Sequence, residues 1–165
     1  MARRPGVVRF AAVMLLLVAL QFLVRPRLGD TRLAPDFILV ALLFLAIRTR
    51  PAVGAAAGFL IGLAIDALTP TAFGAAALAC TVTGFLAGWI KSLVFADNPL
   101  MTSLFVFAAA WLRDAIQTAA ANQLSGGALG WQLLVYSPLA ALTTAVAALV
   151  VLLVFRRWLG LRATA

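Results

Sequence analysis

The chain has 165 residues, of which 65% are apolar and only 11% are charged. Soluble domains carry about 25% charged residues, because a surface in contact with water needs them. The composition therefore excludes a soluble globular protein. The net charge of +8 does not indicate a nucleic-acid partner, since the cationic residues flank apolar runs and form no basic patch.

Hydropathy predicts six membrane spans, in chain order residues 7–24, 34–47, 51–68, 72–90, 100–121 and 131–155. The first is followed by no small-residue cleavage site, so we expect an uncleaved span and not a signal peptide. Backbone groups in lipid must bond within their own segment, and the runs lack the alternation of barrel strands. The expected fold class is an all-α integral membrane protein, a six-transmembrane-helix bundle that forms a single domain over residues 1–165.

The cationic residues predict the orientation of this bundle. Nine of the 13 Lys and Arg residues lie on the side that would be cytoplasmic if the N-terminus is cytoplasmic. Only Arg25, Arg27 and Arg32 lie on the other side, and Arg113 lies within a span. Because cytoplasmic loops carry the excess of Lys and Arg, both termini are expected in the cytoplasm.

Glycines recur at intervals of four in the third and fourth predicted spans. They are Gly54, Gly58, Gly62, Gly84 and Gly88. Positions four apart share one face of a helix, and small residues there let two helix backbones approach closely. Close packing inside the bundle is the usual meaning, and a groove for a partner's helix is the alternative. Under that alternative, replacing Gly58 and Gly62 by Leu weakens partner association while the monomer stays folded.

Besides Arg9 at the start of the first span, four charged residues lie within predicted spans: Asp36, Asp66, Arg113 and Asp114. Charges in a bilayer are costly, so they usually face the bundle interior and find partners. Helix rise places Asp66 and Arg113 at a similar depth, roughly 20 Å from the cytoplasmic side. We hypothesise that the four residues form a polar cluster in the outer half of the membrane, completed by Arg32 or a cationic partner. Such a cluster is either an ion-paired staple that sets helix register or a binding and coupling site.

The sequence contains no His and no Glu, which excludes Ser-His-Asp triads and His-ligated zinc. The Asp residues form no compact metal motif, and no Gly-rich phosphate loop is present. We therefore expect no enzymatic activity, no metal and no cofactor.

The segment that begins at Pro35-Asp36, the glycine ladder from Gly54 to Asp66, and the Gly84/Gly88 span resemble the bacterial rod shape-determining protein MreD family. The resemblance implies a non-enzymatic scaffold of the bacterial inner membrane that helps to organise peptidoglycan synthesis during cell elongation. It implies an MreC-like single-span partner, with MreB-like, RodA-like and transpeptidase components bound directly or indirectly, besides membrane lipid. It also implies a fold similar to the substrate-binding subunits of energy-coupling-factor transporters.

A substrate-binding subunit of an energy-coupling-factor vitamin transporter is the main alternative function. Such subunits commonly dock through an AxxxA pattern in the first span, and Ala11, Ala12 and Ala19 do not have that spacing. A lipid-processing or lipid-flipping enzyme that uses intramembrane Asp residues is a further alternative. A self-associating membrane protein is another, because GxxxG patterns also serve dimerisation.

Overall fold

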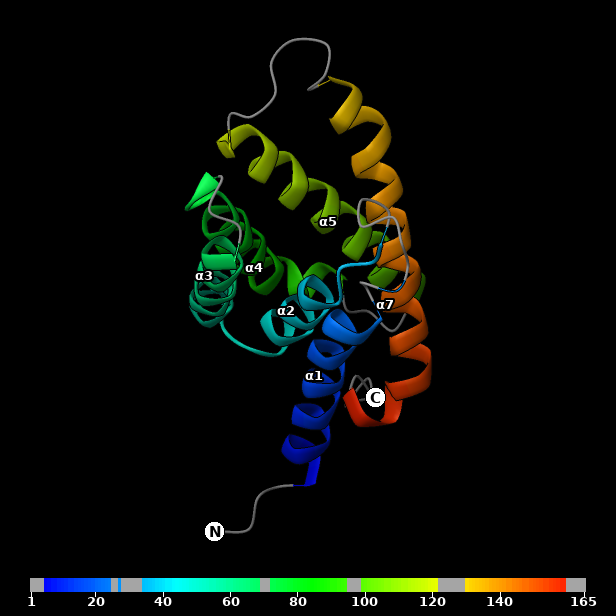
Figure 1. Cartoon of the computed structure of the whole chain (residues 1–165). Coiled ribbons are helices and arrows are strands. Elements are labelled where there is room, and N and C mark those ends of the chain that lie inside the picture. Colours follow the sequence, from blue (N-terminus) through cyan, green and yellow to red (C-terminus); the bar gives the residue numbers. More distant parts are fainter. Residues whose placement is uncertain are drawn as a thin grey trace.

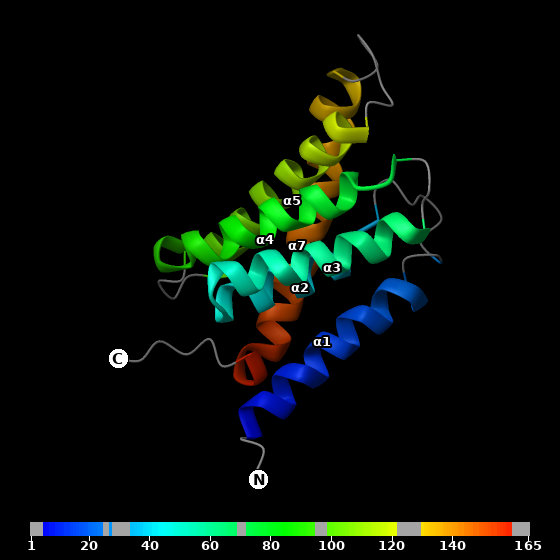
Figure 2. The ribbon, with the colours of Figure 1, turned by 90° about the vertical axis from the view of Figure 1, so that its left-hand side faces the viewer.

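The computed structural model describes residues 5–24, 27, 34–68, 72–94, 99–121 and 130–159. These residues form six α-helices and no strand, which confirms the predicted all-helical fold. The helices are α1 (Pro5–Leu23), α2 (Phe37–Arg48), α3 (Pro51–Leu68), α4 (Ala75–Val94), α5 (Pro99–Ala121) and α7 (Ser137–Leu159). A π-helix, η3 (Gln132–Tyr136), leads directly into α7. Successive α-helices run in opposite directions along the bundle (Figures 1 and 2).

Two helices start three residues later than predicted, for local reasons. α2 begins at Phe37, three residues later than expected, because the Asp36 carboxylate accepts a hydrogen bond from the backbone N–H of Leu39 and acts as N-cap. α4 begins at Ala75 and not at residue 72, because Gly74 has a φ of 96° and therefore cannot be helical. The bounds of α3 agree with the predicted span.

The short helix α2 forms the centre of the bundle. Nine of its twelve residues are buried, and it contacts α1, α3, α4, α5 and α7. A helix of this length rises only about 18 Å, less than the ~30 Å of a bilayer core. Because the other helices surround it, its first residues, including Asp36 just before it, lie inside the protein.

The glycines of α3 lie against the backbone of α4 along an antiparallel seam (Figure 2). A Cβ atom at Gly54, Gly58 or Gly62 would overlap the backbone of Gly84, Cys80 or Ala76, respectively. Each step of four residues forward on α3 is thus matched by a step of four residues back on α4. The groove is filled by a helix of the same chain, which leaves no room for a partner's helix along these glycines.

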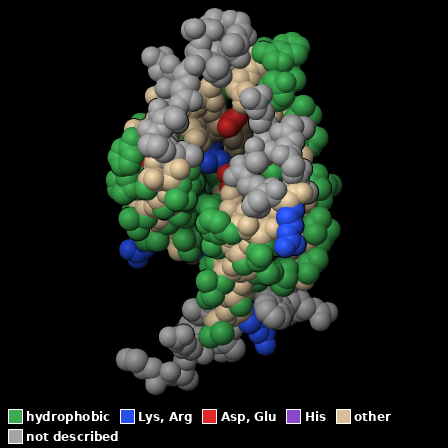
Figure 3. Space-filling model, in the orientation of Figure 1, with side chains coloured by type: hydrophobic (Ala, Val, Ile, Leu, Met, Phe, Trp, Pro, Cys, Tyr) green, Lys and Arg blue, Asp and Glu red, His purple; other side chains and the backbone are tan. Residues whose placement is uncertain are grey.

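The outer surface of the bundle is apolar and much of its polar side-chain content is inside. Leu15 is 71% exposed, Leu60 is 66% exposed and Val154 is 66% exposed, while Asp66 and Thr144 are buried. Figure 3 shows hydrophobic side chains over much of the visible face. Pro51–Leu68 and Gln132–Phe155 are long and apolar enough to cross a bilayer, and Val8–Leu23, Phe37–Arg48 and Ala75–Ile90 are shorter apolar helices. This distribution is the one expected of a protein that lies in lipid.

Candidate functional site: a polar cavity between α2, α5 and the start of α7

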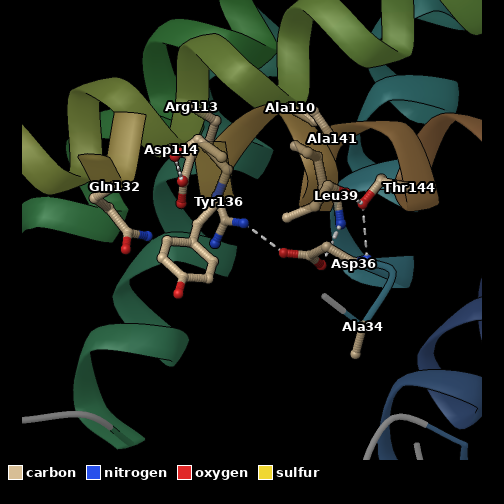
Figure 4. A pocket seen from close by; sticks show the side chains of 12 residues that line it. Ala34, Asp36, Leu39, Ala110, Arg113, Asp114, Gln132, Tyr136, Ala141 and Thr144 are labelled. Carbon is tan, nitrogen blue, oxygen red and sulfur yellow. Dashed lines mark hydrogen bonds and ion pairs between the residues drawn. The ribbon is translucent and has the colours of Figure 1, made fainter. Parts of the chain in front are cut away.

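A cavity of about 170 Å³ lies where the start of α2 meets α5, η3 and α7. Its polar lining consists of Asp36, Arg113, Asp114, Gln132, Tyr136, Ser137 and Thr144. Figure 4 shows these side chains coming from three separate parts of the chain. The space-filling view shows acidic and basic atoms in a hollow between the helices (Figure 3). The cavity therefore gathers charge within an otherwise apolar body.

Asp36 and Arg113 form an ion pair across the cavity, between Oδ2 of Asp36 and Nη1 of Arg113 (Figure 4). Each side chain is only 12% exposed. The other carboxylate oxygen of Asp36 caps α2. The backbone N–H of Asp36 donates a hydrogen bond to Oγ1 of Thr144 at 3.1 Å. The Phe37 N–H donates to Oε1 of Gln21 at 3.0 Å. The residues at the start of α2 are thereby connected to α1, α5 and α7.

Asp114 lines the same cavity but has a different partner. The hydroxyl of Ser137, the first residue of α7, donates a hydrogen bond to Oδ2 of Asp114. Ser137 is placed there by η3, in which the Ser137 N–H bonds to the carbonyl of Gln132, five residues earlier. Pro138 follows and has no N–H to give to the carbonyl of Leu134, and the wider π turn accommodates its ring. Adjacent residues on α5 therefore join that helix to α2 and to α7.

Asp66 is buried but does not enter this cavity. Its carboxylate accepts hydrogen bonds from the backbone N–H groups of Gly74 at 3.0 Å, Ala76 at 3.1 Å and Ala77 at 2.9 Å. These donors belong to the turn before α4 and to its first residues, where N–H groups lack partners within the helix. A carboxylate is also favoured at this end by the helix dipole. Asp66 therefore holds α4 against the end of α3, apart from the other three charged residues.

Sequence reasoning missed the uncharged partners of the charged residues. Ser137 and Thr144 were not singled out. A serine before a proline inside an apolar run is the one local signal at Ser137. Nothing local marks Thr144, whose role depends on the packing of α7 against the start of α2. Arg32, the cation expected to complete the cluster, lies outside the described residues.

The chemistry of the cavity is that of charge pairing and hydrogen bonding. The described part of its lining holds two carboxylates and one guanidinium, and Nε of Arg113 is buried without a hydrogen-bond partner. Among the residues that the structure describes, no group of three His, Cys, Asp or Glu side chains is placed to hold a metal ion.

Fold and cavity together define a helical membrane protein with an apolar exterior and an internal set of charged contacts. The family model for the rod shape-determining protein MreD matches residues 3–159. The chain therefore belongs to the MreD family, a structural family of shape-determining proteins, and has a role in rod-shape determination. No curated protein and no solved structure matches the chain. The fold likeness to transporter subunits stays a prediction, and the family match does not support the vitamin-transporter alternative.

Proposed function

We propose that this protein is a non-enzymatic scaffold of the cell-elongation machinery, which crosses the bacterial inner membrane six times and binds an MreC-like single-span protein. The observation that carries the proposal is the family match, which extends over almost the whole chain. By holding the MreC-like protein in the membrane, the scaffold helps to organise peptidoglycan synthesis by RodA-like and transpeptidase components, with the MreB-like protein on the cytoplasmic side.

The high share of helical residues and their exposed apolar side chains support a scaffold role. Most of the residues that the structure describes are in helices, so contacts with partners are made mainly by helix faces. Exposed apolar side chains such as Leu15, Phe59 and Leu104 lie on three different helices. Such surfaces pack against lipid or against another protein's membrane span.

The path of the chain supports both termini in the cytoplasm. α1 begins and α7 ends at the same end of the bundle (Figures 1 and 2). Arg48, at the last turn of α2, lies over the ring of Phe10 at 4.6 Å from its centroid. This contact places the Arg48 cation beside the first half of α1, the end of the bundle at which cytoplasmic cations are expected.

Co-purification tests the proposal. The full chain, tagged and extracted in a mild detergent from cells that express the elongation proteins of the same genome, is expected to retain the MreC-like protein. RodA-like and transpeptidase components are expected in smaller amounts if they bind indirectly. A tagged six-span protein of unrelated function is the control. Recovery of no elongation component above that control contradicts the proposal.

A further inference from the structure

Among the described residues, the Asp114 carboxylate forms a hydrogen bond but no ion pair of its own. Its Oδ2 accepts a hydrogen bond from Ser137, whereas the neighbouring guanidinium of Arg113 is engaged by Asp36. Among the described residues, no Lys or Arg forms an ion pair with Asp114. A carboxylate within a membrane protein is costly when no cation faces it. A positive group bound in the cavity would therefore stabilise the Asp114 carboxylate.

Arg113 has a buried hydrogen-bond donor without an acceptor. Its Nη1 atom contacts Asp36, but its Nε–H is buried and donates to nothing in the described structure. Buried donors nearly always have an acceptor, because an unmade hydrogen bond loses the solvation of the group without replacement. Figure 4 shows the guanidinium pointing to the cavity between Tyr136 and Asp36. An acceptor with negative charge would complete it.

The size and the walls of the cavity also favour a bound ligand. Its volume of about 170 Å³ is several times the roughly 30 Å³ of one water molecule. One wall is formed by η3, and π-helical turns occur frequently at functional sites. This turn places Gln132, Tyr136 and Ser137 on the lining.

We propose that the cavity binds a zwitterionic phosphoethanolamine group, with its ammonium at Asp114 and its phosphate oxygens at Arg113. One small group of this kind supplies both a cation for Asp114 and an acceptor for Nε of Arg113. The headgroup of a phosphatidylethanolamine lipid and free phosphoethanolamine share this chemistry. The inference concerns a ligand and does not depend on the proposed partner of the scaffold.

The test compares the full chain in two kinds of lipid nanodisc, made of phosphatidylglycerol alone or of phosphatidylglycerol with phosphatidylethanolamine. The unfolding temperature is followed by tryptophan fluorescence. Wild type is expected to gain roughly 5 °C from phosphatidylethanolamine, because a ligand that binds only the folded state stabilises it. Soluble phosphoethanolamine added to phosphatidylglycerol discs is the second arm. If the unfolding temperature rises in both arms, the phosphoethanolamine group alone is sufficient for binding. If it rises only with phosphatidylethanolamine, the bound group is the headgroup of the lipid.

Variants assign the effect to the cavity. Asp114→Asn keeps an acceptor for Ser137 but removes the charge, so it is expected to abolish the rise. Asp66→Asn lowers the unfolding temperature in every lipid and is expected to keep the rise, because Asp66 lies outside the cavity. No rise of wild type in either arm, or an equal rise of Asp114→Asn and wild type, overturns the proposal.

A second measurement needs no variant. In native mass spectrometry of wild type released from discs of equal composition in the two lipids, phosphatidylethanolamine is expected to stay bound preferentially. Equal retention of the two lipids would overturn the lipid as the source of the group.

Discussion

At the scale of single residues, Asp36 combines three contacts that no other described residue combines. Its carboxylate pairs with Arg113 and caps α2, and its backbone N–H donates to Thr144. The ion pair is nearly shielded from solvent, so the loss of one partner leaves the other as an uncompensated buried charge. The residue thus determines how α2 is held between α5 and α7.

The variant Asp36→Asn distinguishes the contribution of the Asp36 charge from that of the N-cap of α2. Asparagine is as good an N-cap as aspartate, so the start of α2 is retained while Arg113 loses its counterion. We expect the free energy of unfolding, measured by titration with sodium dodecyl sulfate in mixed micelles, to fall by about 3 kcal/mol.

The double variant Asp36→Asn with Arg113→Met provides the control for this change. When both charges of the pair are removed, neither partner remains as a buried charge without its counterion. We therefore expect the double variant to recover part of the lost stability. If Asp36→Asn alone leaves the unfolding free energy at the wild-type value, the ion pair does not stabilise the bundle.

At the scale of elements, the seam between α3 and α4 joins two backbones with almost no side chain between them. The carbonyl of Cys80 lies where a Cβ of residue 58 would be, and Gly88 would meet the Cα of Pro51 at 2.8 Å in the same way. Because the obstacle is backbone, a larger side chain can be accommodated only if the two helices separate. The expectation that leucines at Gly58 and Gly62 leave the monomer folded does not agree with this geometry.

Gly58→Leu is therefore predicted to destabilise the isolated monomer. Overpacking against a rigid backbone costs about 3 kcal/mol or more, which exceeds the gain of up to ~1 kcal/mol in helix propensity. The matched control is Ala56→Leu, two residues earlier on the exposed face of α3, where a change within about 0.5 kcal/mol is expected. The measurement is the same detergent titration in the absence of partners. Equal stability of the two variants would exclude a tight seam.

At the scale of the whole molecule, the alternating direction of the helices predicts where the chain ends emerge. Both ends of the helical body lie on one side of the bundle (Figure 1). The excess of Lys and Arg on that side predicts that it faces the cytoplasm.

Reporter fusions test this topology. Green fluorescent protein is expected to fluoresce at either terminus, because it folds in the cytoplasm, and alkaline phosphatase is expected to be inactive at both. Alkaline phosphatase inserted between α5 and η3 should be active, since that connection is predicted to be periplasmic. Activity at only one terminus would show an odd number of spans and contradict the six-span arrangement.

The sequence alone determined the helical class and, over the described residues, the number of helices and most of their ends, because hydropathy and helix-breaking residues act locally. It also determined that charged residues such as Asp36 and Arg113 need partners, since their cost in lipid does not depend on the fold. Only the tertiary structure decided which groups meet. Helix rise predicts depth but not the direction in which a side chain points, so Asp66 was expected beside Arg113 and instead caps α4. Arg113 pairs with Asp36, 77 residues away, because the packing of α2 against α5 turns those two faces toward each other.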